Sequence, residues 1–183
     1  MMNMRSFIVC SIALLMAQAA MAGTGPMRPL LRVSSSSFAD GGQMPARLTC
    51  DGANLSPEIR FATPPAGTRS FAIVVDDQDV PVEFFHWLAY GIPADTRELP
   101  EGASTPSQRL AAAAEGINNF GRMGYGGPCP PAGATHHYVF HVYALDDVPA
   151  LPSGASAQEV NTAIRGHVLA EGRFSGVYAR GGD

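Results

Sequence analysis

The sequence contains no lysine: all 12 basic residues among its 183 are arginine, and the formal net charge is -4. A protein that follows the phosphate backbone of DNA or RNA needs a basic surface, which this composition does not supply. Long helices are also disfavoured, because 20 Gly and 15 Pro favour turns. The hydrophobic share of 46% is typical of a folded chain. We therefore expect one turn-rich domain without a nucleic-acid partner.

The first 22 residues have the composition of a targeting segment. Arg5 precedes an apolar run at 7–17, and Ala20-Met21-Ala22 offers the small residues that signal peptidase accepts. We expect residues 1–22 to be a signal peptide that is removed during secretion. In a bacterium, the expected destination is the periplasm. A membrane anchor is the alternative, but a spanning helix needs about 20 apolar residues and this run is shorter.

The sequence has only three cysteines. Cys10 lies inside the apolar run and not after it, which disfavours a lipid anchor, and it is lost with the leader. Cys50 and Cys129 remain, and in an oxidising compartment they can form one disulfide. Without secretion, two buried thiols would be the better interpretation. Cys-x-x-Cys spacing is missing, so neither a zinc ribbon nor a thioredoxin-type centre is expected.

Short apolar runs between turn signals predict a β-rich domain, and residues 23–31 are expected to be a linker that precedes it. The runs are rich in β-branched and aromatic residues and too short for helices. The expected strands are 59–61, 71–75, 84–90, 136–145 and 173–179.

Few helices are expected. A helix fits 156–170, where Ser156 can cap the first turn and Glu159 can complete a capping box. A second, short helix fits 107–115. The remainder of 98–133 is rich in Gly and Pro, and a loop of this length in a small domain indicates a functional or disulfide-tied segment.

The aromatic run 84–90 contains a histidine. Regular alternation places His86 on one face of the strand with Phe84, Leu88 and Tyr90. A histidine on an aromatic strand is more often a buried structural residue than a ligand contact.

Carboxylates, imidazoles and a phenol nevertheless gather at the ends of three expected strands. Asp77 and Asp79 follow one strand, His86 lies in the next, and His136 and Tyr138 begin a third. Such groups can bind a metal, act as acid and base, or hold a charged ligand. Paired aspartates most often form turns, so they do not indicate a site by themselves. The functional interpretation rests on polar groups gathered at the ends of three strands.

Hydrolytic enzymes of the common types are poorly supported. There is no G-x-S-x-G elbow, and Cys129 stands between two prolines and is a poor nucleophile. Zinc could take ligands from His86, His136, His137 and Asp79, but the HExxH spacing is missing. A metal-dependent hydrolase therefore remains only as an alternative.

Four motifs follow one another in a characteristic order. They are Asp77-Gln78-Asp79-Val80-Pro81, His86-Trp87, Tyr125-Gly126-Gly127-Pro128-Cys129-Pro130-Pro131 and His136-His137-Tyr138-Val139-Phe140. This series resembles the phosphatidylethanolamine-binding protein (PEBP) family, and within it the bacterial Raf-kinase-inhibitor-like branch labelled YbhB/YbcL. The resemblance extends over about residues 32–180.

The resemblance implies a mainly β fold of two antiparallel sheets with a few short peripheral helices. It also implies a small pocket for phosphate-like anions, with no catalytic residue, cofactor or metal. The ligand-binding residues carried over are Asp77, Asp79, Pro81, His86, Trp87, Tyr125, His136 and Tyr138. Imidazoles and a phenol can donate to anion oxygens, while carboxylates orient the imidazoles or meet an ammonium group.

The aspartate motif departs from the family pattern. Gln78 and Val80 stand where relatives carry Pro and Ala, and the connection to His86 is short, so we expect a different pocket rim. The resemblance also implies a cis peptide bond before Pro81.

Together these observations predict a secreted binding protein for a phosphate monoester or a phospholipid head group, with modulation of a protein partner as a second expected role. Two alternatives belong to other classes. One is a metal-dependent hydrolase that uses the same Asp/His cluster, and the other is a protease or kinase inhibitor that works independently of the pocket.

Overall fold

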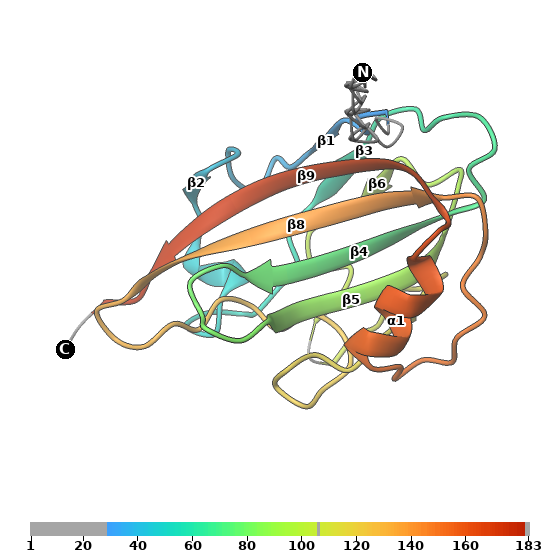
Figure 1. Cartoon of the computed structure of the whole chain (residues 1–183). Helices are drawn as coiled ribbons and strands as arrows, with labels where there is room; N and C mark the ends of the chain where they lie inside the picture. Colours follow the sequence, from blue (N-terminus) through green and yellow to red (C-terminus); the bar gives the residue numbers. More distant parts are fainter. Residues whose placement is uncertain (1–28, 106, 182–183) are drawn as a thin grey trace, which may run out of the picture.

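The computed structural model describes residues 29–105 and 107–181. Within them the chain is mainly β-structure with one α-helix (Figure 1), which confirms the expected fold class. No helix in this part is long and apolar enough to span a membrane. The strands are β1 (Val33–Ser34), β2 (Gly42–Gln43), β3 (Ile59–Phe61), β4 (Ser70–Asp77), β5 (Phe84–Pro93), β6 (Glu98–Leu99), β7 (Ala114–Glu115), β8 (Thr135–Leu145) and β9 (Val168–Ala179). The helices are a 3-10 turn (Ala46–Leu48) and α1 (Ala157–Ile164). The leader at 1–22 lies outside the described residues.

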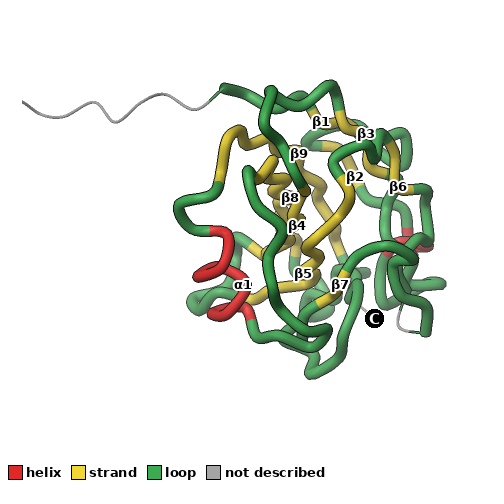
Figure 2. The backbone as a smooth tube through the Cα atoms, turned by 90° about the vertical axis from the view of Figure 1, so that its right-hand side faces the viewer, coloured by secondary structure: helices red, strands yellow, loops and turns green. Residues whose placement is uncertain are grey.

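The strands form two sheets (Figure 2). The smaller sheet has the order β1-β3-β6, and the larger has the order β2-β9-β8-β4-β5-β7. All pairs are antiparallel except β2 with β9, which are parallel. The long strands β4, β5, β8 and β9 make up the body of the larger sheet, and their ends position the site described below.

The main core lies between the two sheets. Phe61 of the smaller sheet stacks on Phe71 of β4 with ring centroids 4.9 Å apart, and Phe140 stacks on Phe174 at 4.7 Å. A second apolar cluster on the opposite face of the larger sheet includes Tyr90. Strands β4 and β5 of the larger sheet are thus buried on both faces, which explains the nearly continuous apolar runs at 71–75 and 84–90.

Helix α1 covers the second cluster and begins as expected. The Ser156 hydroxyl accepts from the Glu159 backbone N–H, and the Glu159 carboxylate accepts from the Ser156 N–H, which completes the capping box. The expected end at residue 170 is wrong. Gly166 has φ +90°, which a helix cannot continue, and β9 already begins at Val168, where it pairs with Leu145.

The helix expected at 107–115 is also wrong within the described residues. The last two residues of this segment instead form β7 at the edge of the larger sheet. The Glu115 carboxylate is buried there and accepts hydrogen bonds from Trp87 Nε1 at 2.7 Å, the Ser104 hydroxyl at 2.6 Å and the Leu110 backbone N–H at 3.1 Å. These contacts outweigh the helical propensity of the alanine run.

The expected disulfide is confirmed. Cys50 and Cys129 are bonded, with their Cα atoms 5.4 Å apart. The surrounding chain reinforces the link, because the Cys50 N–H donates to the Pro128 carbonyl at 3.0 Å and the Gly127 N–H donates to Asn54 Oδ1 at 2.6 Å. The long Gly/Pro loop is therefore tied to the segment that follows the 3-10 turn.

Candidate functional site

Three strand ends meet at one edge of the larger sheet, on the left in Figure 1. Asp77 ends β4 and is the register partner of both Tyr138 on β8 and Phe84 on β5. Because β4 is antiparallel to both neighbours, its end meets their beginnings. Four polar groups converge here and are called the strand-end cluster: Asp77, His86, His136 and Tyr138.

Asp77 and His136 form the central pair of the cluster. The His136 Nδ1 and the Asp77 Oδ2 lie 2.6 Å apart, and the two side chains are only 13% and 6% exposed. The second carboxylate oxygen accepts the Asp79 backbone N–H at 2.9 Å. Both oxygens of Asp77 are thus engaged, and the imidazole keeps Nε2 for another partner.

Asp79 forms a second, outer pair. Its Oδ2 accepts the backbone N–H of His137 at 2.6 Å and lies 2.9 Å from the His137 Nδ1. The backbone N–H of His137 is the main reason why the pKa of Asp79 lies below its usual value. Since the side chain of His137 is 58% exposed, this pair lies at the rim of the cluster.

His86 reaches the cluster because the strand is irregular. A register shift between β4 and β5 leaves Trp87 opposite Val75 but Phe85 opposite Asp76, so His86 is the extra residue of a β-bulge. Both His86 and Trp87 therefore face the core. The predicted alternation, which placed Leu88 and Tyr90 on the same face of the strand as His86, is wrong. Leu88 pairs with Val74 on the face away from His86, and Tyr90 packs in the second apolar cluster.

The imidazole of His86 is almost fully buried and tied to the Gly/Pro loop. Its Nδ1 lies 2.6 Å from the Gly126 carbonyl oxygen, so this nitrogen carries a proton. Burial lowers the pKa of His86 below its ordinary value, and the Gly126 carbonyl and Asp77 only partly oppose this shift. His86 is accordingly neutral at pH 7.

Tyr138 contributes a phenol from the centre of the cluster. Its ring meets His86 edge-on at 5.0 Å. The hydroxyl is buried and has no hydrogen-bond partner of acceptable geometry among the described residues. Burial, followed by the charge of Asp77, raises the pKa of Tyr138, while the backbone N–H of Cys129 acts weakly in the opposite direction. The phenol is therefore a neutral group available to donate or accept.

Comparison with known proteins identifies the fold. The family model for phosphatidylethanolamine-binding protein matches residues 34–179. The chain belongs to the PEBP family. It is 43% identical over 154 residues to a UPF0098 protein of Aquifex aeolicus, which covers 82% of this chain and 90% of the relative. Two crystal structures, each 32% identical, superpose well. Escherichia coli YbcL, a PEBP-family member, has a TM-score of 0.75 with 82% and 99% of the two chains covered. The PEBP homologue CT736 of Chlamydia trachomatis has a TM-score of 0.73, with 81% and 97% covered.

In this PEBP-family member, two residues predicted at the site lie in the core behind it. The indole N–H of Trp87 is taken by Glu115, and the Tyr125 hydroxyl donates to the Leu48 carbonyl at 2.9 Å. The two rings meet edge-on at 5.8 Å, and both are buried. Their polar groups already have protein partners, so they support the cluster from behind.

Pro81 lies in an exposed bend between β4 and β5, and the expected cis bond before it is wrong. No cis peptide occurs among residues 29–105 and 107–181. Neighbouring Val82 is 76% exposed, so no packing holds the chain in the less stable isomer. The bend is where Gln78 and Val80 depart from the family pattern.

Besides Phe84, which the sequence placed on the face of His86, the structure adds two aromatic neighbours that sequence reasoning missed, Phe120 and Tyr178. Half-buried Phe84 and Phe120 meet at 5.0 Å and pack on His86 at 5.1 and 5.3 Å. Tyr178 of β9 is the register partner of His136 and donates its hydroxyl to Asp51 at 2.7 Å. No local pattern marks Phe120, because its contact with His86 depends on the loop path.

The histidines do not gather as metal ligands. His86 is bound to a carbonyl, His136 to Asp77, and His137 to Asp79 at the rim. Over the described ranges, no three His, Cys, Asp or Glu side chains are grouped so that they could hold a metal ion.

Proposed function

We propose that the protein binds a phosphate-type oxyanion at the strand-end cluster, without chemical turnover. The observation that supports this best is the buried Tyr138 hydroxyl, which has no hydrogen-bond partner in the described part of the chain. It belongs to the same cluster as the His136 imidazole, which Asp77 fixes through Nδ1. Leaving a buried polar group unsatisfied costs about 1–3 kcal/mol. An oxyanion placed between the phenol and the His136 Nε2 would remove that cost.

The charges of the cluster define how an anion can be held. Asp77 and Asp79 are the fixed charges here, and both are negative, so positive charge must come from protonated imidazoles. An imidazole loses its positive charge as the pH rises. Binding of sulfate, whose own charge is constant, should therefore weaken with rising pH.

The cellular setting follows from features outside the cluster. The signal peptide expected at 1–22 and the Cys50–Cys129 disulfide favour an extracytoplasmic, most simply periplasmic, location. One relative, LppC of Mycobacterium tuberculosis, is 39% identical over 158 residues and bears a provisional lipoprotein name. We infer that the ligand is a phospholipid head group or a phosphate monoester, and that the loaded protein can act on a protein partner.

Calorimetry with phosphoethanolamine and inorganic phosphate tests the binding function. Replacing His136 with Ala, or Tyr138 with Phe, should cost about 1.5–3 kcal/mol of affinity if each donates to a charged ligand. Two controls match these changes outside the cluster: Tyr143→Phe on the other face of β8, and His167→Ala beside Asp146. The controls should bind as the wild type does.

Two results would contradict this function. One is the absence of saturable binding of either probe to the wild-type protein. The other is hydrolysis of p-nitrophenyl phosphate that a chelator abolishes, which would support the metal-dependent hydrolase instead. Equal melting temperatures of all variants exclude unfolding as the cause of weaker binding.

A further inference from the structure

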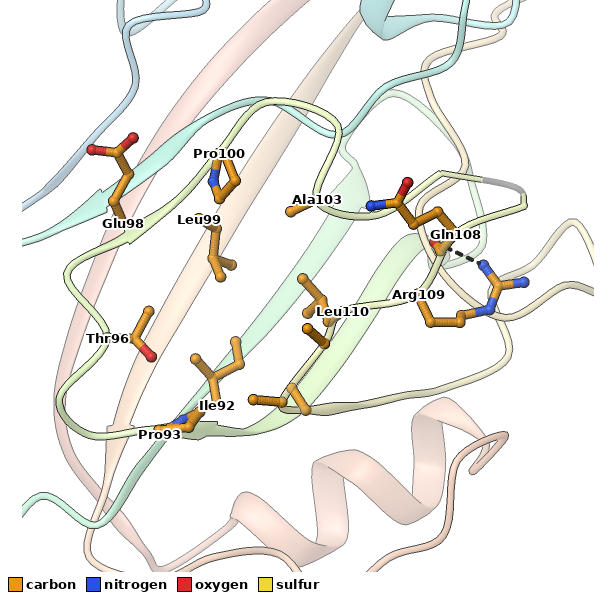
Figure 3. Close-up of a pocket in the computed structure, with 13 residues that line it drawn as sticks. Ile92, Pro93, Thr96, Glu98, Leu99, Pro100, Ala103, Gln108, Arg109 and Leu110 are labelled. Carbon is orange, nitrogen blue, oxygen red and sulfur yellow. Dashed lines mark hydrogen bonds between the residues drawn. The ribbon is translucent and has the colours of Figure 1, made fainter.

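A cavity of about 320 Å³ lies far from the strand-end cluster (Figure 3). It is formed where β5 ends at Pro93, whereas the cluster lies beside the start of the same strand at Phe84. Edge strand β6 of the smaller sheet borders it on one side, and the segment leading into edge strand β7 borders it on the other. The apolar lining consists of Ile92, Pro93, Leu99, Pro100, Ala103, Leu110 and Ala111–Ala113.

The charged residues at the cavity direct their charges away from it. Figure 3 shows the Glu98 carboxylate and the Arg109 guanidinium pointing outward from the apolar side chains. The Glu98 carboxylate lies 3.4 Å from Arg60, and the Arg109 guanidinium donates to the Thr105 carbonyl at 2.8 Å. The remaining polar lining groups, Thr96 and Gln108, are neutral.

The cavity is built into the fold. One wall is the run Ala111–Ala113, whose methyl groups are too small to fill the space. Buried Glu115 holds two parts of the lining in place, because its carboxylate accepts from the Ser104 hydroxyl, next to Ala103, at 2.6 Å and from the Leu110 N–H at 3.1 Å. Fixed walls and small side chains together keep the space open.

We propose that this cavity binds a neutral, mostly hydrocarbon molecule about the size of two fused rings. An apolar cavity of about 150 Å³ suffices for benzene, and ligand pockets begin near about 300 Å³. The cavity has about twice the volume that suffices for benzene. Its walls are mostly hydrocarbon, with one neutral polar group at Thr96 and another at Gln108. An ionised ligand would lose its hydration without a compensating charge.

Titration calorimetry with 2-naphthol, which is uncharged at pH 7, tests the proposal. We expect saturable binding at one site, with amide NMR shifts at Ala103 and Ala113, and no comparable binding of 2-naphthalenesulfonate. Filling the cavity with Ala113→Leu, or at its more exposed rim with Ala112→Leu, should weaken 2-naphthol binding at least roughly tenfold. Ala150→Leu, an exposed alanine elsewhere, is the matched control.

The test separates this site from the strand-end cluster. Ala113→Leu should leave phosphoethanolamine binding unchanged, and His136→Ala should leave 2-naphthol binding unchanged. Unsaturable 2-naphthol binding to the wild type, equal binding to the folded leucine variants, or equal binding of the sulfonate would each overturn the proposal.

Discussion

His86 and Gly126 are 40 residues apart in the chain and joined by two hydrogen bonds. The His86 Nδ1 lies 2.6 Å from the Gly126 carbonyl, and the Gly126 N–H donates to the His86 carbonyl at 2.9 Å. Cys129, a little further along the same loop, is bonded to Cys50. The orientation of one ring of the strand-end cluster therefore depends on a loop that the disulfide fixes.

Gly126→Ala should disturb both the fold and the cluster. A Cβ at this position would lie 2.6 Å from the Phe120 ring, which itself packs on His86. Such overpacking costs about 1–3 kcal/mol. Urea denaturation and phosphoethanolamine calorimetry should both register the change. Gly181→Ala is the control, since its Cβ would meet nothing within 4 Å. Wild-type stability and affinity in Gly126→Ala would show that the close approach is unimportant.

Removal of the disulfide should destabilise the protein strongly. The bridge joins positions 79 residues apart, and closing a loop of that length contributes about 4 kcal/mol in the chain-entropy treatment. The double variant Cys50→Ser, Cys129→Ser should therefore unfold at a much lower urea concentration. A loss below about 1 kcal/mol would mean that the reduced unfolded chain is already restricted.

Two histidines should titrate on opposite sides of the ordinary histidine value of 6.5. Burial depresses the pKa of His86, whereas the nearby carboxylate of Asp76, followed by that of Glu171, raises the pKa of His141. Because the pKa of His86 is lower in the folded state than in the unfolded state, the free energy of unfolding decreases as the pH falls below the unfolded-state pKa. NMR titration of the imidazole signals measures both, and the reverse order would contradict the assigned environments.

His141 should make stability depend on pH in the opposite sense. Its Nε2 and Nδ1 each lie 3.2 Å from a carboxylate oxygen, of Asp76 and Glu171 respectively. Because the folded-state pKa is raised, the stabilisation is complete below the unfolded value and is lost as the pH rises through the folded value. Urea denaturation of wild type and His141→Gln should differ more at pH 6 than at pH 9. The same difference at both values would exclude this linkage.

Trp87→Phe should weaken the buried network around Glu115. The variant removes the indole donor at 2.7 Å and leaves the carboxylate with two of its donors. The loss should be about 1–3 kcal/mol. A double-mutant cycle with Glu115→Gln separates the hydrogen bond from the lost packing. Strict additivity of the two changes would show that the bond contributes nothing.

The sequence predicts best where burial alone decides the structure. The apolar run at 71–75 became the centre of β4, which is buried on both faces, and the run at 136–145 became β8, whose buried residues alternate with half-buried ones. The family resemblance assigned Asp77 and His136 to one site, and the structure places their side chains 2.6 Å apart. Local alternation, in contrast, misplaced Leu88 and Tyr90, because a bulge depends on the pairing with β4 and leaves no mark in β5 itself.

The remaining differences also come from tertiary contacts. The alanine-rich segment at 107–115 has good helical propensity, yet the buried Glu115 carboxylate holds it extended. The expected cis bond before Pro81 depended on a motif that this chain carries with two substitutions, Gln78 and Val80.

Adjacent residues at the end of β4 face opposite sides of the larger sheet. Asp77 turns inward to His136, and Asp76 turns outward to His141. A charge on the imidazole of His141 therefore acts on the Asp77–His136 pair through a single layer of backbone. The effective dielectric constant in this layer is far below that of water. A charge change on the outer face is therefore a way to alter the anion affinity proposed for the strand-end cluster while leaving Asp77, His86, His136 and Tyr138 unchanged.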